Sequence, residues 1–179
     1  FHNHVTSALT VEMFERHDRA RFEITAMSFG PDDNSAMRAR LVKAFDRFHD
    51  ARQQSDRAVA ELLRAWEIDI AVDLGGHTSG ARPWVLAHRP CPVQAKYMGY
   101  PGTSGSDFID YLIADRIVVP PDQEPFFSEK LAALPDTLWV TDTARPVPPP
   151  PGRTEAGLPE SGFVFCCFNH NWKITAPIF

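Results

Sequence analysis

The sequence contains no run of about 18 apolar residues, the length that a membrane-spanning helix needs. Its N-terminus also lacks the basic stretch followed by an apolar stretch that marks a secretory signal peptide. These two absences exclude a membrane span and a membrane partner, and they predict a soluble, cytoplasmic protein.

Cysteine and basic residues are both scarce. Only three cysteines occur, Cys91, Cys166 and Cys167, and none belongs to a Cys-x-x-Cys motif, so the sequence supports neither a disulfide framework nor a zinc site. The chain has 18 Lys and Arg residues against 23 Asp and Glu residues, a net charge of -5, and no basic cluster. Electrostatic capture of nucleic acid or of acidic lipid is therefore disfavoured.

Proline is the residue type in clear excess, with 16 in 179 residues. Residues 144–152 read ARPVPPPPG, a composition that favours a stiff polyproline II segment. We interpret residues 144–161 as a linker between a lobe at 1–143 and the start of a second lobe at 162–179. Because the chain begins at Phe1 without Met, we interpret it as a piece of a longer protein, with the first strand of the first lobe missing.

Helix and strand patterns alternate along the first two thirds of the chain. Hydrophobic residues recur at helical spacing in residues 6–16, 37–48 and 55–66. Thr6 or Ser7 would cap the first of these helices, and Ser55 the third. Such alternation is typical of parallel strands joined by crossover helices, so the sequence predicts an α/β fold with a doubly wound, mainly parallel sheet. The predicted strands lie in residues 21–29, 68–74, 93–98, 108–114 and 162–168.

In open α/β sheets, ligands bind at the carboxyl ends of the strands, so the loops after strands are the candidate sites. Arg82 lies beside a predicted helix start and close to three glycines, a combination that favours an anion such as phosphate. The alternative is that the glycines end a strand and Arg82 pairs with a carboxylate. Four loops combine small residues with donors or bases: residues 1–6, 75–82, 99–105 and 169–173.

No familiar nucleotide-binding motif occurs in these loops. Residues 99–105 match neither a Walker loop nor a Gly-x-Gly-x-x-Gly fingerprint. No Asp-x-Asp pair is present to bind a divalent ion on a nucleotide sugar. His4 could act as a base or a hydrogen-bond donor, and Lys173 could bind a diphosphate. Their alternatives are a surface histidine and a solvated lysine at a helix start.

Taken together, the loops belong to a long series of motifs. In chain order these are DLGGHTSGAR at 73–82, RPCPVQ at 89–94, GYPGTSG at 99–105, DY at 110–111, IAD at 113–115, SEK at 128–130 and LP at 134–135. The matching part extends from FHNHVTS at 1–7 to FNHNWKI at 168–174 and so covers nearly the whole chain. This series resembles the protein O-linked N-acetylglucosamine transferases and their bacterial homologues.

The resemblance implies a GT-B glycosyltransferase, with a Rossmann-like N-terminal catalytic lobe followed by the first strand of a second Rossmann-like lobe. It implies transfer of N-acetylglucosamine from UDP-N-acetylglucosamine to Ser or Thr hydroxyls of a protein acceptor, with inversion. No metal and no other cofactor would be required.

Motif by motif, the resemblance also implies site residues. His4 falls on the family's active-site histidine, and Lys173 would be the second catalytic residue, neutralising charge on the leaving UDP. Gly102 and Thr103 would line the sugar side of the cleft. The donor-binding residues implied in this way are Asn169, His170, Lys173, Gly102 and Thr103.

The sequence departs from the family's usual pattern at Ser79, His2 and His170, where Lys, Gly and Gln are common. The upstream tetratricopeptide repeats and the uridine-binding C-terminal loops of relatives are not in this chain, so we expect the fragment alone to be inactive. Two other functions stay open. One is a noncatalytic sugar-nucleotide-binding module, and the other is a UDP-N-acetylglucosamine epimerase of the same architecture, which would need no acceptor.

Overall fold

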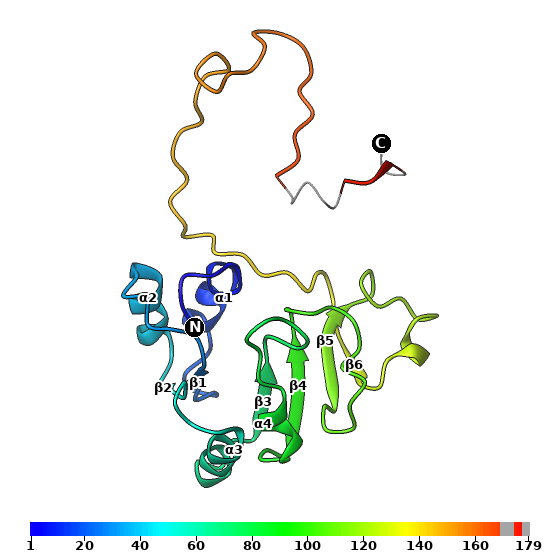
Figure 1. The fold of residues 1–179 in the computed structure, drawn as a ribbon. Coiled ribbons are helices and arrows are strands. Elements are labelled where there is room, and N and C mark those ends of the chain that lie inside the picture. Colours follow the sequence, from blue (N-terminus) through cyan, green and yellow to red (C-terminus); the bar gives the residue numbers. More distant parts are fainter. Residues whose placement is uncertain (169–173, 177–179) are drawn as a thin grey trace. The chain divides into compact units, whose positions relative to one another are not determined.

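The computed structural model describes residues 1–168 and 174–176. It divides the chain into two compact units, Phe1–Ala144 and Arg145–Phe179. None of the helices in the described residues is long and apolar enough to cross a membrane. The helices and strands of the first unit are shown in Figure 1; in chain order they are α1 (Val5–Glu15), β1 (Thr25–Ser28), α2 (Ala36–Ala44), β2 (Arg47–Asp50), α3 (Asp56–Ala65), β3 (Ile70–Asp73), α4 (Trp84–Ala87), β4 (Val93–Tyr97), β5 (Tyr111–Asp115), the 3-10 helix η1 (Glu124–Phe126) and β6 (Lys130–Leu134).

The strands form two sheets. β1 and β2 make a two-stranded sheet, and the second sheet has the order β3-β4-β5-β6. Every one of these strand pairs is parallel, which confirms the predicted parallel arrangement. Within the described residues, no strand pairs with the edge of β1 that faces away from β2, or with the edge of β3 that faces away from β4. A further strand before Phe1 stays a prediction.

Side-chain caps define where the helices begin. Ser55 accepts a hydrogen bond from the backbone N–H of Ala58 at 3.2 Å and caps α3, as predicted. The predicted cap of the first helix is wrong, because His4 occupies that position and its side chain accepts from the N–H of Thr6. Thr6 and Ser7 already lie inside α1, where their backbone is helical and a side chain no longer serves as the cap.

The second predicted helix is too long. α2 ends at Ala44, and Phe45 takes an extended conformation with φ -110° and ψ 152°. Phe48 lies in β2 instead and pairs with Ala26 of β1. Both phenylalanines pack against the same apolar cluster, so hydrophobic spacing alone does not distinguish a helix from a strand here. Phe48 belongs to a strand because it pairs with β1, which is distant in the sequence.

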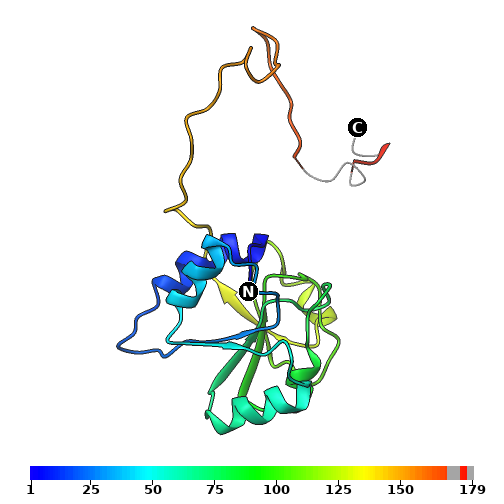
Figure 2. The same ribbon diagram turned by 60° about the vertical axis from the view of Figure 1, so that its left-hand side comes forward.

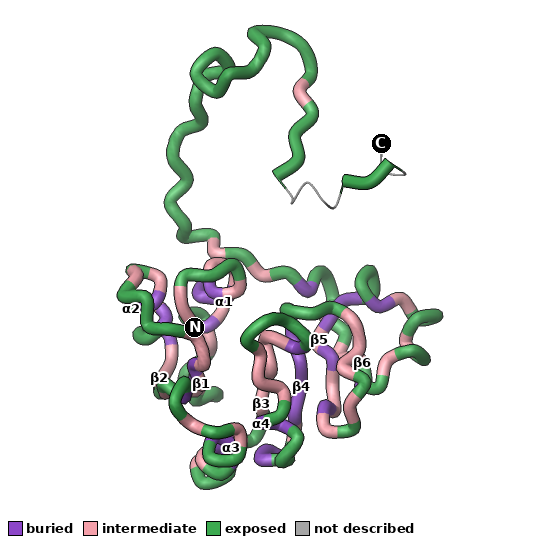
Figure 3. The backbone as a smooth tube through the Cα atoms, in the orientation of Figure 1, coloured by how far each residue is buried: buried purple, intermediate pink, exposed green. Residues whose placement is uncertain are grey.

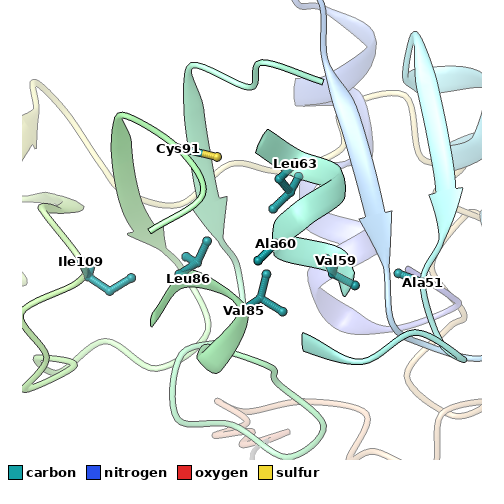
Figure 4. Close-up of a cluster of buried hydrophobic side chains, with 8 residues drawn as sticks. All are labelled: Ala51, Val59, Ala60, Leu63, Val85, Leu86, Cys91 and Ile109. Atoms are coloured by element: carbon teal, nitrogen blue, oxygen red, sulfur yellow. The ribbon is translucent and has the colours of Figure 1, made fainter. Parts of the chain in front are cut away.

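Two apolar clusters hold the helices on the sheets. α1 and α2 lie side by side (Figure 2) and pack around Val11, Phe14 and Leu41. Leu74, directly after β3, also packs against this cluster. The other cluster joins α3 and α4 to the sheet (Figure 4), and its buried members are Ala51, Val59, Ala60, Leu63, Val85, Leu86, Cys91 and Ile109.

β4 is buried along most of its length (Figure 3). Two of its buried side chains, Gln94 and Lys96, are polar. The side-chain amide nitrogen of Gln94 donates to the carbonyl oxygens of Leu86 at 2.9 Å and Phe108 at 2.6 Å, whereas its buried Oε1 has no hydrogen-bond partner among the described residues. Burying such groups costs free energy unless they find partners, so the partners of Lys96 become important for the site.

The described residues of the second unit, 145–168 and 174–176, contain no strand. The predicted strand at 162–168 is therefore not formed, and Phe163, Phe165 and Phe168 are 83%, 91% and 97% exposed. A strand is held by backbone hydrogen bonds to a neighbouring strand, and this part of the chain pairs with none. The division into a lobe, a linker and a second lobe stays a prediction.

Candidate active site

The loops predicted to carry the chemistry gather at the carboxyl ends of the strands. Arg38 donates to the hydroxyl of Ser28, the last residue of β1, at 2.8 Å and also to the carbonyl oxygen of Phe1. Leu74 packs in the same apolar cluster as Phe1. The loop at residues 1–4 and the loop after β3 therefore lie at one edge, the edge where open α/β sheets bind ligands.

His4 stands at the start of α1 with extended backbone and an exposed side chain. Its Nδ1 accepts a hydrogen bond from the backbone N–H of Thr6 at 3.3 Å. An accepting Nδ1 carries no proton, so the neutral ring has its proton on Nε2. Of the two roles predicted for His4, this arrangement favours the hydrogen-bond donor over the base.

The loop that carries His4 is held by its neighbours. The backbone N–H of Asn3 donates to Asp33 at 2.8 Å, and this bond is the main cause that lowers the pKa of Asp33 to about 2. The rings of His2 and His4 lie 5.4 Å apart. Burial is the largest cause that lowers the pKa of His2.

The loop after β3 turns sharply around Asp73. The Asp73 carboxylate accepts hydrogen bonds from the backbone N–H groups of Gly75 at 3.0 Å and Gly76 at 2.9 Å. Gly76 has a φ of 57°, a conformation that favours glycine. The strand end is thus closed by its own aspartate, which leaves these two N–H groups unable to donate to a ligand.

Arg82 pairs with a carboxylate, which was the alternative to an anion-binding role. It donates to Asp56 at 2.7 Å and to the carbonyl oxygens of Ala51 at 3.1 Å and Gln54 at 2.7 Å. Its guanidinium also lies over the ring of Phe29. These contacts tie the loop after β3 to the start of α3, so Arg82 is a structural residue and not a free anion-binding cation.

The loop at residues 99–105 interlocks with the loop after β3. Gly99 has a φ of 52°, and a Cβ at this position would come within 2.6 Å of the carbonyl oxygens of Leu74 and Gly75. The His77 ring meets the Tyr100 ring edge-on at 5.4 Å, and its Nε2 donates to the carbonyl oxygen of Ser104 at 2.9 Å. The two loops therefore form one packed surface.

Gly102 and Thr103, predicted to line the sugar side of the cleft, both lie on this loop. The Thr103 hydroxyl donates to the Glu129 carboxylate at 2.8 Å, and its oxygen accepts from the backbone N–H groups of Ser128 and Gly105, each at 3.1 Å. The carbonyl oxygen of Gly102 accepts from Lys96. These polar groups are engaged within the protein, so they shape the loop.

Three of the predicted site residues lie outside the described part of the chain, and two residues beneath the loop at 99–105 were not predicted. The sequence pattern was not used to assign a role to these two, Lys96 and Glu129. A lysine inside the apolar strand pattern of residues 93–98 is the signal that could have indicated Lys96. The predicted donor-binding residues Asn169, His170 and Lys173 lie outside the described residues.

Two surface hollows in the described part of the chain have volumes of about 470 and about 390 Å³. They flank β5 and β6, and neither is lined by the predicted site residues His4, Gly102 or Thr103. Among the residues that the structure describes, no group of three or more His, Cys, Asp and Glu side chains is arranged to hold a metal ion.

Known proteins share the fold and sequence of most of this chain. A solved structure of a lysine-to-methionine mutant of the Thermobaculum terrenum O-GlcNAc transferase superposes with a TM-score of 0.74 and 31% identity, covering 76% of this chain and 26% of that chain. The chain is thus α/β with the Rossmann-like N-terminal lobe of a GT-B protein, as predicted.

Sequence comparison agrees with the structural match. A relative from Arabidopsis thaliana, the probable UDP-N-acetylglucosamine--peptide N-acetylglucosaminyltransferase SEC, is 36% identical over 99% of this chain and 19% of its own length. The corresponding Caenorhabditis elegans enzyme is 36% identical over 81% of this chain and 13% of its own length. The chain thus spans less than a fifth of these relatives. The family model described as glycosyl transferase family 41 matches residues 1–148, and the chain belongs to this family.

Proposed function

We propose that the intact protein transfers N-acetylglucosamine from UDP-N-acetylglucosamine to Ser or Thr hydroxyls of protein acceptors, with inversion at the anomeric carbon. The observation that carries this proposal is the match along 99% of the chain to a relative named as a UDP-N-acetylglucosamine--peptide N-acetylglucosaminyltransferase. Because the chain covers only 19% of that relative, the activity is proposed for the intact protein. The 179-residue chain alone is expected to be inactive.

His4 contributes an N–H donor to the reaction. Its Nδ1 is used by the backbone N–H of Thr6, which supports Nε2 as the nitrogen that meets the reacting groups. In an inverting transfer, the acceptor oxygen attacks the anomeric carbon from the face opposite UDP, the bond from that carbon to the UDP oxygen breaks, and the proton of the acceptor hydroxyl is released to solvent. A fixed donor at this point orients the reacting groups without itself removing a proton.

The leaving diphosphate requires compensation of its growing negative charge. We assign this role to Lys173, with Asn169 and His170 beside it, from their match to the family's diphosphate loop. An ammonium at the breaking bond stabilises the transition state more than the ground state. The absence of an Asp-x-Asp pair from the sequence supports a reaction without a metal ion or other cofactor.

The loop at residues 99–105 contributes shape on the sugar side. Because the Thr103 hydroxyl and the Gly102 carbonyl are bonded within the protein, their contribution is a fixed backbone surface. Acidic net charge supports an absence of nucleic-acid partners. A cytoplasmic location stays a prediction.

The test is a transfer assay with the full-length protein, UDP-N-acetylglucosamine and a Ser/Thr-containing peptide library. Mass spectrometry should detect peptides that gain one N-acetylhexosamine, and NMR of the product should show the β-anomer formed from the α-linked donor. An α-linked product would contradict inversion.

Two control reactions separate the alternatives. Incubation without acceptor, followed by NMR of the sugar, detects C2 epimerisation; formation of the epimer would favour the epimerase. Calorimetric binding of UDP-N-acetylglucosamine without transfer to any peptide would favour the noncatalytic binding module.

A further inference from the structure

A buried ion pair lies directly beneath the loop at residues 99–105. The Nζ of Lys96 in β4 is 3.9 Å from Oε1 of Glu129, and their side chains are 2% and 0% exposed. Lys96 lies in β4 and Glu129 immediately precedes β6, so the two residues approach each other from opposite sides of β5. Neither residue belongs to the loop.

Both members of the pair bind the loop. Lys96 donates to the carbonyl oxygen of Gly102, and Glu129 accepts from the Thr103 hydroxyl at 2.8 Å and from the backbone N–H of Ser104 at 2.7 Å. Three successive loop residues are therefore held by one pair. The Lys96 ammonium also lies 5.4 Å from the centre of the Tyr100 ring.

The two charges depend on each other and on the loop. Burial lowers the pKa of Lys96, whereas the Glu129 and Asp73 carboxylates act in the opposite direction. Burial by itself raises the pKa of Glu129, but hydrogen bonds from Ser104 and Thr103 outweigh it and hold this pKa below its usual value. Removing either residue leaves a buried charge without its partner, which is strongly unfavourable.

Stability alone is a poor explanation for such a pair. Replacing both members of a buried ion pair by well-packed neutral side chains is often neutral or stabilising for a fold. Here every hydrogen bond between the pair and the loop involves residues 102–104, two of which are predicted to lie at the donor sugar. The contacts are thus concentrated where a small displacement would affect ligand geometry.

We propose that Lys96 and Glu129 are positioning residues, which fix the backbone of residues 102–104 against the sugar of the donor. This inference rests on the proposed function. It assigns the two residues to recognition of the sugar and not of the diphosphate, which the proposed function assigns to Asn169, His170 and Lys173.

The experiment compares two ligands in the full-length protein. The dissociation constants of UDP and of UDP-N-acetylglucosamine are measured by calorimetry for the parent, Lys96→Met, Glu129→Gln and the double variant. Lys96→Met keeps most of the stem and removes the charge, and Glu129→Gln is nearly isosteric. The matched control is Arg57→Met with Glu61→Gln, an ion pair on α3 whose side chains are 79% and 58% exposed.

We expect Lys96→Met and Glu129→Gln to weaken UDP-N-acetylglucosamine binding by about tenfold or more while UDP binding changes little, since a displacement of about 1 Å can cost about 10²-fold in a positioned site. The donor KM should rise in parallel. A general loss of structure would reduce the active fraction and leave the ratio of the two constants unchanged. If Lys96→Met folds poorly, the ratio of the two dissociation constants can be measured for the folded fraction of Glu129→Gln instead.

The outcomes distinguish failure of the positioning role from failure of the proposed function. A parent protein that transfers sugar, with variants that keep the parental ratio of UDP to UDP-N-acetylglucosamine affinity, overturns the positioning role and leaves the proposed function standing. A parent that binds neither ligand overturns the proposed function and the positioning role together. The exposed control pair should leave both constants unchanged.

Discussion

Nδ1 of His4 accepts the backbone N–H of Thr6 at 3.3 Å, so a single imidazole both caps α1 and stands at the candidate active site. The cap fixes the ring's position on the first turn of the helix. It also determines which nitrogen carries the proton, because an acceptor nitrogen has none. Stability and chemistry at this residue can therefore be separated by the choice of substitution.

His4→Asn retains a side-chain acceptor at the helix start, whereas His4→Ala removes it. We expect both variants of the full-length protein to lose turnover by about 10²-fold, the effect of removing one positioned donor, with a much smaller change in donor affinity. Only His4→Ala should also lower the free energy of unfolding, by about 1 kcal/mol. Steady-state kinetics and urea unfolding check this; parental turnover in both variants would make His4 an ordinary capping residue.

Lys173→Met keeps most of the side-chain stem and removes the charge. We expect turnover of the full-length protein to fall by about 10²- to 10³-fold, because the ammonium compensates charge that grows on the leaving UDP. UDP affinity should also decrease. Single-turnover kinetics and calorimetry over a range of salt concentrations measure both effects. Parental values for both would show that Lys173 is a solvated residue with no role at the diphosphate.

Gly99→Ala should be far more damaging than Gly105→Ala. Both glycines have positive φ, 52° and 64°, so each substitution incurs a backbone cost of about 1 kcal/mol. Only at Gly99 would the new Cβ also collide with backbone, 2.6 Å from two carbonyl oxygens, whereas open space surrounds Gly105. Thermal unfolding should show a clearly larger loss of stability for Gly99→Ala than for Gly105→Ala, and transfer assays should show lost turnover for Gly99→Ala alone; equal effects would contradict the interlocked loops.

Glu12 in α1 predicts a specific loss of stability in acid. Its pKa is lowered from 4.5 to about 2, chiefly by hydrogen bonds from the Thr143 hydroxyl and backbone N–H and then by Arg16. A lowered folded-state pKa means that the contribution to stability is complete above about pH 4.5 and disappears as the pH falls toward about 2.

Glu12→Gln should therefore be less stable than the parent at pH 7 and should differ less from it at pH 3. Urea unfolding of the 179-residue chain at several pH values measures this difference, and Glu61→Gln, an exposed carboxylate on α3, is the control. A constant difference between parent and Glu12→Gln over the whole range would show that the titration of Glu12 is not linked to folding.

Much of the fold was predictable because it depends on local patterns. The short apolar run at Ile70–Asp73, the cap at Ser55 and the glycine-rich loops are local signals, and each predicts the element found there. Alternation of helices with strands then favours parallel pairing, since parallel strands need long connections. The α/β class and the edge at which the loops gather follow from these patterns.

Only the tertiary structure decided the features that depend on distant partners. Phe48 is a strand residue because it pairs with β1, and residues 162–168 form no strand because no described segment pairs with them. Thr103 is engaged because Glu129, 26 residues later, accepts its hydroxyl. The charge of Lys96 is acceptable in the core only beside that same carboxylate.

The sequence by itself determined the α/β class, the family motifs and the loops that carry the candidate site, since these are written in local spacing and order. The tertiary structure alone decided which groups of the described loops are bound within the protein. Hydrogen bonds and ion pairs form between residues brought together by strand pairing, and no local pattern records that Lys96 and Glu129 meet beneath the same loop.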